Sequence, residues 1–267
     1  MDNRPIGVFD SGVGGLTAVR VLRKLLPGED ILYFADTANV PYGSKSVPEL
    51  RKLAAGAAGR LRDLGAKAIL VACGTVSSNC LDEVERATHL PHCGVVLPAA
   101  FAAANTTENG RVGVLSTEAT ARSGAFERAI KSANAAVEVF SYGTRLLVPL
   151  AEAGRTNYAY KDVREAVDAS VAPLIDKNID TLVLGCTHFP LLAGAISSAL
   201  GGDVKLIDTG EAGARECTRL LREHDLLSDK KSGGRLTCLV SGDEYSFAGA
   251  AAVFLPGGTY SVRIERA

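Results

Sequence analysis

The chain has 267 residues, of which 47% are hydrophobic and 22% are charged, so it can form one large or two ordinary domains and is too apolar to be disordered. Its 29 basic and 30 acidic residues give a net charge of −1, which argues against nucleic acid or an anionic membrane as a partner. No apolar run reaches the roughly 18 residues of a membrane span, and the N-terminus passes directly into a predicted strand. We therefore expect a cytoplasmic protein without a signal peptide.

Strands and helices alternate from the start of the chain. Short runs of branched apolar residues predict strands at 6–9, 31–35, 68–72 and 93–97. Helical patterns follow three of these strands, at 16–26, at 46–64 and around 81–84, and residues 36–45 have the composition of a loop. Ser46 and Glu49 predict a capping box for the second helix. Pro98 is expected to end the strand at 93–97.

The alternation continues to the C-terminus. Further strands are predicted at 112–115, 137–140, 181–184, 204–207, 236–240 and 260–264. Helices are predicted around 126–130, 146–153, 163–176, 211–221 and 245–253, and a further one beginning at Pro190. Such steady alternation predicts an α/β protein with mainly parallel sheets covered by helices on both faces.

Two of the six cysteines share one sequence context. Cys73 and Cys186 each follow a predicted buried strand, and each stands just before a threonine-containing segment that begins a helix. Ligands of α/β proteins bind at the carboxyl ends of strands, and a helix start lowers the pKa of a nearby thiol. These two thiols are therefore the candidate reactive groups. The other four cysteines are predicted to be buried packing groups: Cys80, Cys93, Cys217 and Cys238.

Two further features lie close to predicted strand ends. Asp10 begins a glycine-rich turn at 10–15 that leads into a helix and is suited to an anion, although it departs from the dinucleotide-binding pattern. A helix cap is the alternative role for Asp10. His188 lies two residues after Cys186, where an imidazole can hold or share protons with the thiol. The cysteines form no CxxC pair, which favours reduced thiols over a zinc site or disulfides.

Four segments together resemble glutamate racemase: 10–17, 41–43, 72–75 and 185–192. The resemblance implies two pseudo-symmetric α/β domains, 1–97 with 209–267 and 98–208, with the active site between them. It further implies interconversion of L- and D-glutamate without a cofactor or metal, a supply of D-glutamate for bacterial peptidoglycan, and a homodimer.

The resemblance also assigns roles to residues. Cys73 would act on D-glutamate and Cys186 on L-glutamate, with Asp10, His188 and Glu152 assisting the thiols. The implied substrate contacts are Asp10, Ser11, Tyr42, Gly43, Gly74, Thr75, Thr187 and His188. This pairing is chemically reasonable, because inversion of a carbon requires proton removal on one face and proton delivery on the other.

Gly74 departs from the family, which usually has asparagine between the first cysteine and the threonine. Three readings are open. A polar contact to the substrate is missing, or water or a neighbour such as Ser77 fills the gap, or Gly74 makes room for a shifted loop or another substrate. Racemisation of aspartate or another acidic amino acid is the alternative within this class of enzyme. A non-catalytic amino-acid-binding protein is the alternative outside it, and it would not need both thiols.

Overall fold

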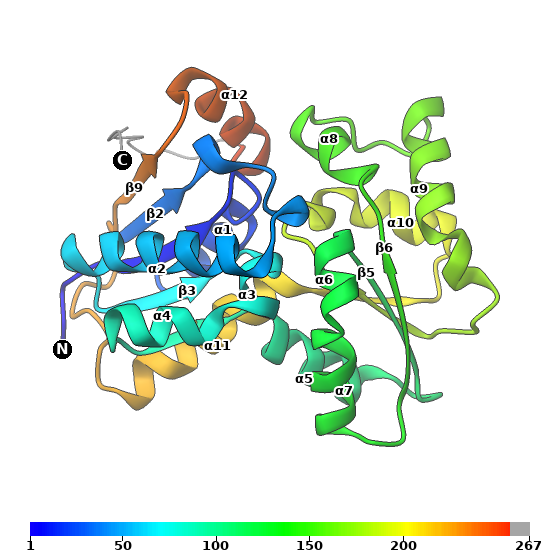
Figure 1. Cartoon of the computed structure of the whole chain (residues 1–267), viewed down its shortest axis with the longest axis horizontal. Helices are drawn as coiled ribbons and strands as arrows, with labels where there is room; N and C mark the ends of the chain where they lie inside the picture. The colour runs from blue at the N-terminus through cyan, green and yellow to red at the C-terminus, as the bar shows by residue number, and fades with distance from the viewer. Residues whose placement is uncertain (257–267) are drawn as a thin grey trace.

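The computed structural model describes residues 1–256, so the strand predicted at 260–264 lies outside the described residues. The fold contains two parallel sheets, one in each lobe (Figure 1). The first sheet has the order β4-β3-β1-β2-β9. Its strands are β1 (Ile6–Asp10), β2 (Ile31–Ala35), β3 (Ala68–Val71), β4 (His92–Gly94) and β9 (Leu236–Val240).

The second sheet repeats the strand order of the first. It has the order β6-β5-β7-β8, with strands β5 (Arg111–Ser116), β6 (Glu138–Gly143), β7 (Thr181–Leu184) and β8 (Lys205–Asp208). When the strands of each sheet are numbered by their order along the chain, the spatial order across both sheets is second, first, third, fourth. This corresponds to β2-β1-β3-β4 in the first sheet, which β9 extends beyond β2, and to β6-β5-β7-β8 in the second. The predicted α/β fold with parallel sheets is confirmed. The exact domain limits stay a prediction.

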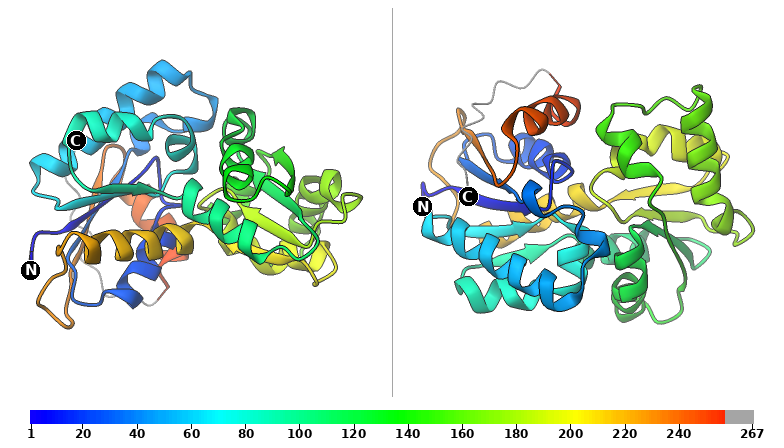
Figure 2. Two further views of the ribbon diagram at one scale, coloured as in Figure 1. Left: turned by 90° about the horizontal axis from the view of Figure 1, so that it is seen from below. Right: turned by 45° about the horizontal axis from the view of Figure 1, so that its top comes forward.

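Helices cover both faces of each sheet (Figure 2). One face of the first sheet packs against α1 (Leu16–Leu25), α11 (Thr209–Glu223) and α12 (Glu244–Phe254), and the other against α2 (Val47–Asp63), α3 (Gly74–Asn79) and α4 (Leu81–Thr88). The second sheet packs on one face against α8 (Leu147–Glu152), α9 (Lys161–Ile175), the 3₁₀ helix η3 (Phe189–Leu192) and α10 (Ala193–Ala199). Its other face packs against α5 (Val96–Thr106) and α7 (Ala125–Ala133).

Side chains of the buried strands alternate between the two cores of the first lobe. Ile6 and Val8 belong to the core that contains α1, whereas Phe9 belongs to the core that contains α2. In β3, Leu70 likewise belongs to the core that contains α1, and Val71 to the core that contains α2. This two-residue period is the geometry of a strand with both faces covered, and it explains why the predicted strands are apolar throughout.

One predicted element is wrong. The strand expected at 93–97 is only β4, which ends at Gly94, and α5 begins at Val96. Pro98 lies in the first turn of α5, where a missing N–H costs no helical hydrogen bond, so it does not mark a break. Short 3₁₀ helices, Thr37–Asn39 and Tyr42–Ser44, also interrupt the loop predicted at 36–45.

The predicted capping box is confirmed. Ser46 and Glu49 exchange hydrogen bonds at the start of α2, where the Glu49 carboxylate accepts from the Ser46 N–H at 2.9 Å. Among the helices within residues 1–256, none is both long and apolar enough to cross a membrane.

A buried ion pair ties the first sheet together at the end opposite the two cysteines. Lys67 precedes β3 and Glu29 precedes β2, and Lys67 Nζ lies 2.5 Å from Glu29 Oε2. Lys67 Nζ also donates to the carbonyl oxygen of Asp2 at 2.7 Å, and Glu29 Oε1 accepts from the N–H of Ser228 at 2.7 Å. The pair therefore joins the N-terminus, two strand starts and the segment before β9.

Candidate active site between the two sheets

The two candidate thiols follow corresponding strands. Cys73 comes two residues after β3, the third strand of the first sheet in chain order, and Cys186 comes two residues after β7, the third strand of the second. Their side chains are buried, with exposed fractions of 5% and 6%. Gly74 and Gly185, their chain neighbours, lie against each other across the two sheets. The fold therefore brings both strand ends to one place.

Asp10 is the last residue of β1, beside β3, and its side chain is buried. Its Oδ1 accepts a hydrogen bond from the Gly12 N–H at 2.8 Å, and Oδ2 has no hydrogen-bond partner within residues 1–256. Gly15, not Asp10, is the cap of α1, so the helix-cap role is wrong. Burial raises the pKa of Asp10, although the charge of His188 and the Gly12 bond oppose that shift.

Cys73 has an environment that the sequence did not indicate. Its sulfur lies 3.8 Å from Ser11 Oγ. Burial, and then the charge of Asp10, raises the pKa of Cys73 to about 12, although hydrogen bonds from Val76 and Ser11 act in the opposite direction. The lowered pKa expected from the helix start is wrong, because α3 has only six residues and the thiol is cut off from water.

Cys186, His188 and Glu152 form a chain of side chains. Cys186 Sγ lies 3.6 Å from His188 Nδ1, and His188 Nε2 lies 3.0 Å from Glu152 Oε1. Burial lowers the pKa of His188, but the contacts with Cys186 and Glu152 outweigh burial and raise it to about 10. The ring of Phe254, from α12, meets the imidazole edge-on with 5.5 Å between centroids. His188 is thus a buried group that can hold a proton next to a thiol.

The glycine-rich turn fits against the second lobe. A Cβ atom on Gly14 would lie 2.2 Å from Thr187 Oγ1 and 2.6 Å from His188 Nδ1, so only glycine permits this approach. Thr17, in the helix that follows, donates from Oγ1 to the carbonyl oxygen of Thr187 at 3.1 Å. The turn therefore holds the segment that carries Cys186 and His188.

The Tyr42 side chain is held by Asp36, which is not among the site residues predicted from the sequence. Its hydroxyl donates to Asp36 Oδ2 at 2.5 Å, and Asp36 also accepts from Ser241 Oγ at 2.7 Å. Asp36 directly follows β2, so the strand-end rule that singled out the cysteines could have found it. Gly43 adjoins the second lobe, where a Cβ atom would lie 3.7 Å from Thr117 Cβ.

A chain of threonine hydroxyls crosses between the lobes. Thr75 Oγ1, in α3, lies 3.3 Å from Thr117 Oγ1, and Thr117 Oγ1 donates to Thr120 Oγ1 at 3.1 Å. Thr117 follows β5 and caps α6 (Glu118–Ser123). Thr117 and Thr120 are not among the site residues predicted from the sequence, although Thr117 stands at the carboxyl end of a strand.

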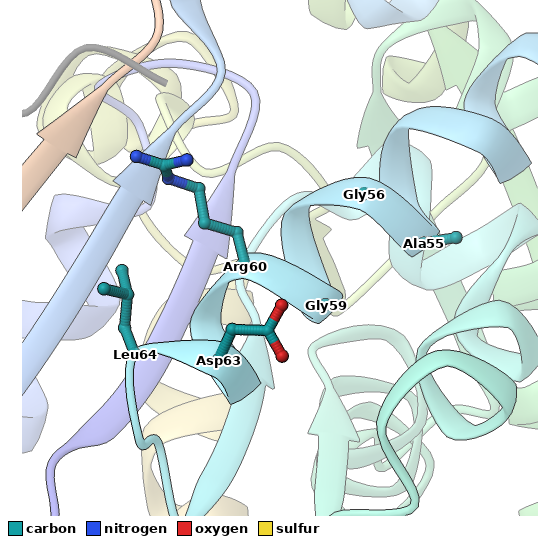
Figure 3. Close-up of a pocket in the computed structure, with 6 residues that line it drawn as sticks. All are labelled: Ala55, Gly56, Gly59, Arg60, Asp63 and Leu64. Carbon is teal, nitrogen blue, oxygen red and sulfur yellow. The ribbon is translucent and has the colours of Figure 1, made fainter.

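A separate hollow on α2 contains none of the predicted site residues (Figure 3). Its volume is about 390 Å³, and its lining comes from α2 and the residue that caps the end of that helix: Ala55, Gly56, Gly59, Arg60, Asp63 and Leu64. Within the part of the chain that the structure describes, no three His, Cys, Asp or Glu side chains are grouped as metal ligands.

Known proteins resemble this chain over its whole length. Residues 16–217 match the family described as Asp/Glu/Hydantoin racemase. A glutamate racemase of Corynebacterium diphtheriae is 39% identical over 266 residues, covering 100% of this chain and 98% of the relative. A crystal structure of glutamate racemase from Francisella tularensis with D-glutamate has a TM-score of 0.91 and 37% identity, covering 100% of this chain and 98% of that one. The chain therefore belongs to the Asp/Glu/Hydantoin racemase family.

Proposed function

We propose that this protein interconverts L- and D-glutamate with two thiols and without a cofactor. The observation that supports this most is the placement of Cys73 and Cys186 at corresponding strand ends of two sheets that face one site. The substrate is inferred from the similar proteins, which are glutamate racemases at 37–39% identity over nearly their full lengths. The proposal extends to a cytoplasmic homodimer that supplies D-glutamate for peptidoglycan.

In the proposed reaction, the Cys73 thiolate removes the α-proton of D-glutamate and the Cys186 thiol delivers a proton to the opposite face. The product is L-glutamate, with a thiol at Cys73 and a thiolate at Cys186, and the reverse direction exchanges these roles. A raised pKa makes the Cys73 thiolate scarce but strongly basic, which suits removal of a weakly acidic α-proton.

Polar groups around the thiols suit an amino acid substrate. The buried Asp10 Oδ2 is an acceptor without a partner in residues 1–256, and it can accept a hydrogen bond from an α-ammonium group. The hydroxyls of Ser11 and Thr187 can donate to a carboxylate and stabilise the charge that develops when the proton leaves. The hydroxyls of Thr75 and Thr117 can do the same once they rotate away from the chain of contacts that ends at Thr120. We extend the proposed substrate contacts to Thr117 and Thr120.

The proposal is tested by incubating the purified protein with each enantiomer of glutamate and of aspartate in D₂O. We expect loss of optical rotation and exchange of the α-proton for both enantiomers of glutamate. Activity should survive a metal chelator and reagents that trap pyridoxal phosphate, and it should be lost on thiol alkylation. Turnover of aspartate in preference to glutamate, or binding without proton exchange, would contradict the proposal.

Glu152 is proposed to act as a positioning residue through His188. In Glu152→Gln, we expect the pKa of His188 to fall, because the contact with Glu152 is one of the causes that raise it above its usual value. His188 also faces Cys186 and Asp10, which are unchanged. The imidazolium should then lose its proton at lower pH, so the alkaline limb of the kcat profile should move to lower pH. We expect kcat itself to fall about tenfold, less than the loss of a full acid–base group.

The measurements for this variant are the pH dependence of kcat and an NMR titration of the His188 ring. Glu85→Gln is a matched control, because Glu85 Oε2 lies 3.0 Å from His92 Nδ1 in a pair remote from the thiols. An unchanged alkaline limb in Glu152→Gln, with Glu85→Gln also unchanged, would show that Glu152 does not act through His188.

A further inference from the structure

Gly74 lies at a point of close approach between the two lobes. A Cβ atom on Gly74 would lie 2.8 Å from the carbonyl oxygen of Gly185, which is closer than real Cβ atoms come to a neighbour. The next atoms are well separated, with Thr120 Oγ1 at 3.9 Å. The obstacle to a side chain is thus a single backbone atom, which cannot rotate away as the end of a flexible side chain can.

Gly185 is fixed in the second lobe. Its N–H donates to the carbonyl oxygen of Leu115 at 2.7 Å, directly after β7, which is paired with β5 on one side and β8 on the other. A Cβ atom on Gly185 would itself lie 2.9 Å from Ser116 Cβ, so the backbone here is already packed against β5. Gly185 therefore has no room to retreat from a side chain at position 74.

The segment that carries Gly74 is equally fixed in the first lobe. The N–H of Ser77 donates to the carbonyl oxygen of Cys73 at 2.8 Å, and Ser77 Oγ accepts from the N–H groups of Val95 and Val96 at 3.0 and 3.2 Å. Ser77 is thus bound to the segment where the chain crosses to the second lobe. Ser77 Oγ lies farther from the Cβ position of Gly74 than Thr120 Oγ1, which is at 3.9 Å, so Ser77 does not fill the gap left by the missing asparagine.

We infer that Gly74 sets the separation of the two halves of the site. Because position 74 has no side chain, the residue after β7 packs directly against the start of α3. A side chain at position 74 must push the ends of β3 and β7 apart. The Thr75–Thr117 contact of 3.3 Å spans the same gap and would be lost with it. Gly74 therefore makes room for the second lobe, and its substitution should open the site.

The expected effect of Gly74 substitutions on catalysis rests on the proposed function, whereas the expected opening of the site between the two lobes does not. Two-sided proton transfer requires both sulfurs within reach of one carbon atom, and a displacement of about 1 Å can reduce a rate about a hundredfold. We therefore expect Gly74→Ala and Gly74→Asn to lower kcat/KM for both enantiomers of glutamate by about tenfold to a hundredfold, mainly through kcat.

The opening is measured without substrate, as the rate at which iodoacetamide alkylates each cysteine, followed by mass spectrometry. Alkylation of Cys73 and Cys186 should be severalfold faster in both Gly74 variants than in the wild type, since both thiols are nearly buried in the closed arrangement. Cys217 and Cys238, with 0% exposure, report unfolding and should remain unlabelled. Gly56→Ala is the control, because Gly56 is an exposed helical glycine with nothing within 4 Å of its Cβ position.

Unchanged alkylation of Cys73 and Cys186 in folded Gly74→Ala would overturn the inference, and so would a higher kcat/KM for glutamate in Gly74→Asn. If iodoacetamide labels all six cysteines of Gly74→Asn, that variant is unfolded. The alkylation rates of the smaller Gly74→Ala variant then decide whether the inference holds. A wild type that does not racemise glutamate would defeat the proposed function, and the alkylation rates would still decide whether Gly74 sets the separation.

Discussion

Replacing either Cys73 or Cys186 by alanine is expected to abolish measurable racemisation, a loss of about 10⁴-fold, at the upper end for general acid–base groups. Each thiol serves one face of the α-carbon, so the remaining thiol cannot complete the inversion. The remaining thiol can still exchange the α-proton of its own enantiomer with solvent, with retention of configuration. Such exchange is expected in L-glutamate for Cys73→Ala, which keeps Cys186, and in D-glutamate for Cys186→Ala, which keeps Cys73. The measurements are circular dichroism of the substrate and ¹H NMR in D₂O.

Cys80→Ala is the matched control for the thiol variants. Cys80 is also a buried cysteine, and it ends α3, the helix that begins directly after Cys73. Its loss removes the same sulfur volume without touching the proposed chemistry, so racemisation should be nearly normal. Near-normal racemisation by a correctly folded Cys73→Ala or Cys186→Ala protein would instead rule out the two-thiol mechanism.

Lys67→Met is expected to lower the free energy of unfolding by about 3–5 kcal/mol, because it leaves the buried Glu29 carboxylate without its cation. The double variant Glu29→Met/Lys67→Met should recover much of that loss, since an apolar pair of similar volume requires no charge to be buried. Chemical denaturation monitored by circular dichroism measures the difference.

Lys131→Met provides the comparison on the surface. Lys131 Nζ lies 2.8 Å from Glu127 Oε1 in an exposed pair on α7, for which about 0.5 kcal/mol is the expected contribution. If Lys67→Met were no more destabilised than Lys131→Met, the ion pair of Lys67 and Glu29 would not be what holds the strand starts together.

The sheets were predictable because their strands are short, apolar and regularly separated by helical patterns. The same regularity placed Cys73 and Cys186 at strand ends, since parallel strands expose only their termini. α5 was missed because its first turn contains Pro98 and its remaining residues are mostly alanine, which shows little amphipathic period. Pro98, which was expected to end a strand, instead lies in the first turn of α5.

The contacts of the site were less predictable than its location. Thr75 and Thr117 are 42 positions apart and meet only because two lobes pack together. The pKa of Cys73 depends on burial and on Asp10, which no local pattern reveals. The sequence left open whether Gly74 marks a missing substrate contact or extra room, and its steric meaning depends on where the carbonyl of Gly185 lies.

The position of β9 has a consequence for the order in which the protein can fold during synthesis. β9 pairs with β2 through residues 236–240, whereas the four strands of the second sheet that the structure describes end by Asp208. Of the strands within residues 1–256, those of the second sheet therefore all leave the ribosome before β9. Until then the outer edge of β2 presents unpaired backbone groups, the kind of edge that chaperones protect from association with other nascent chains.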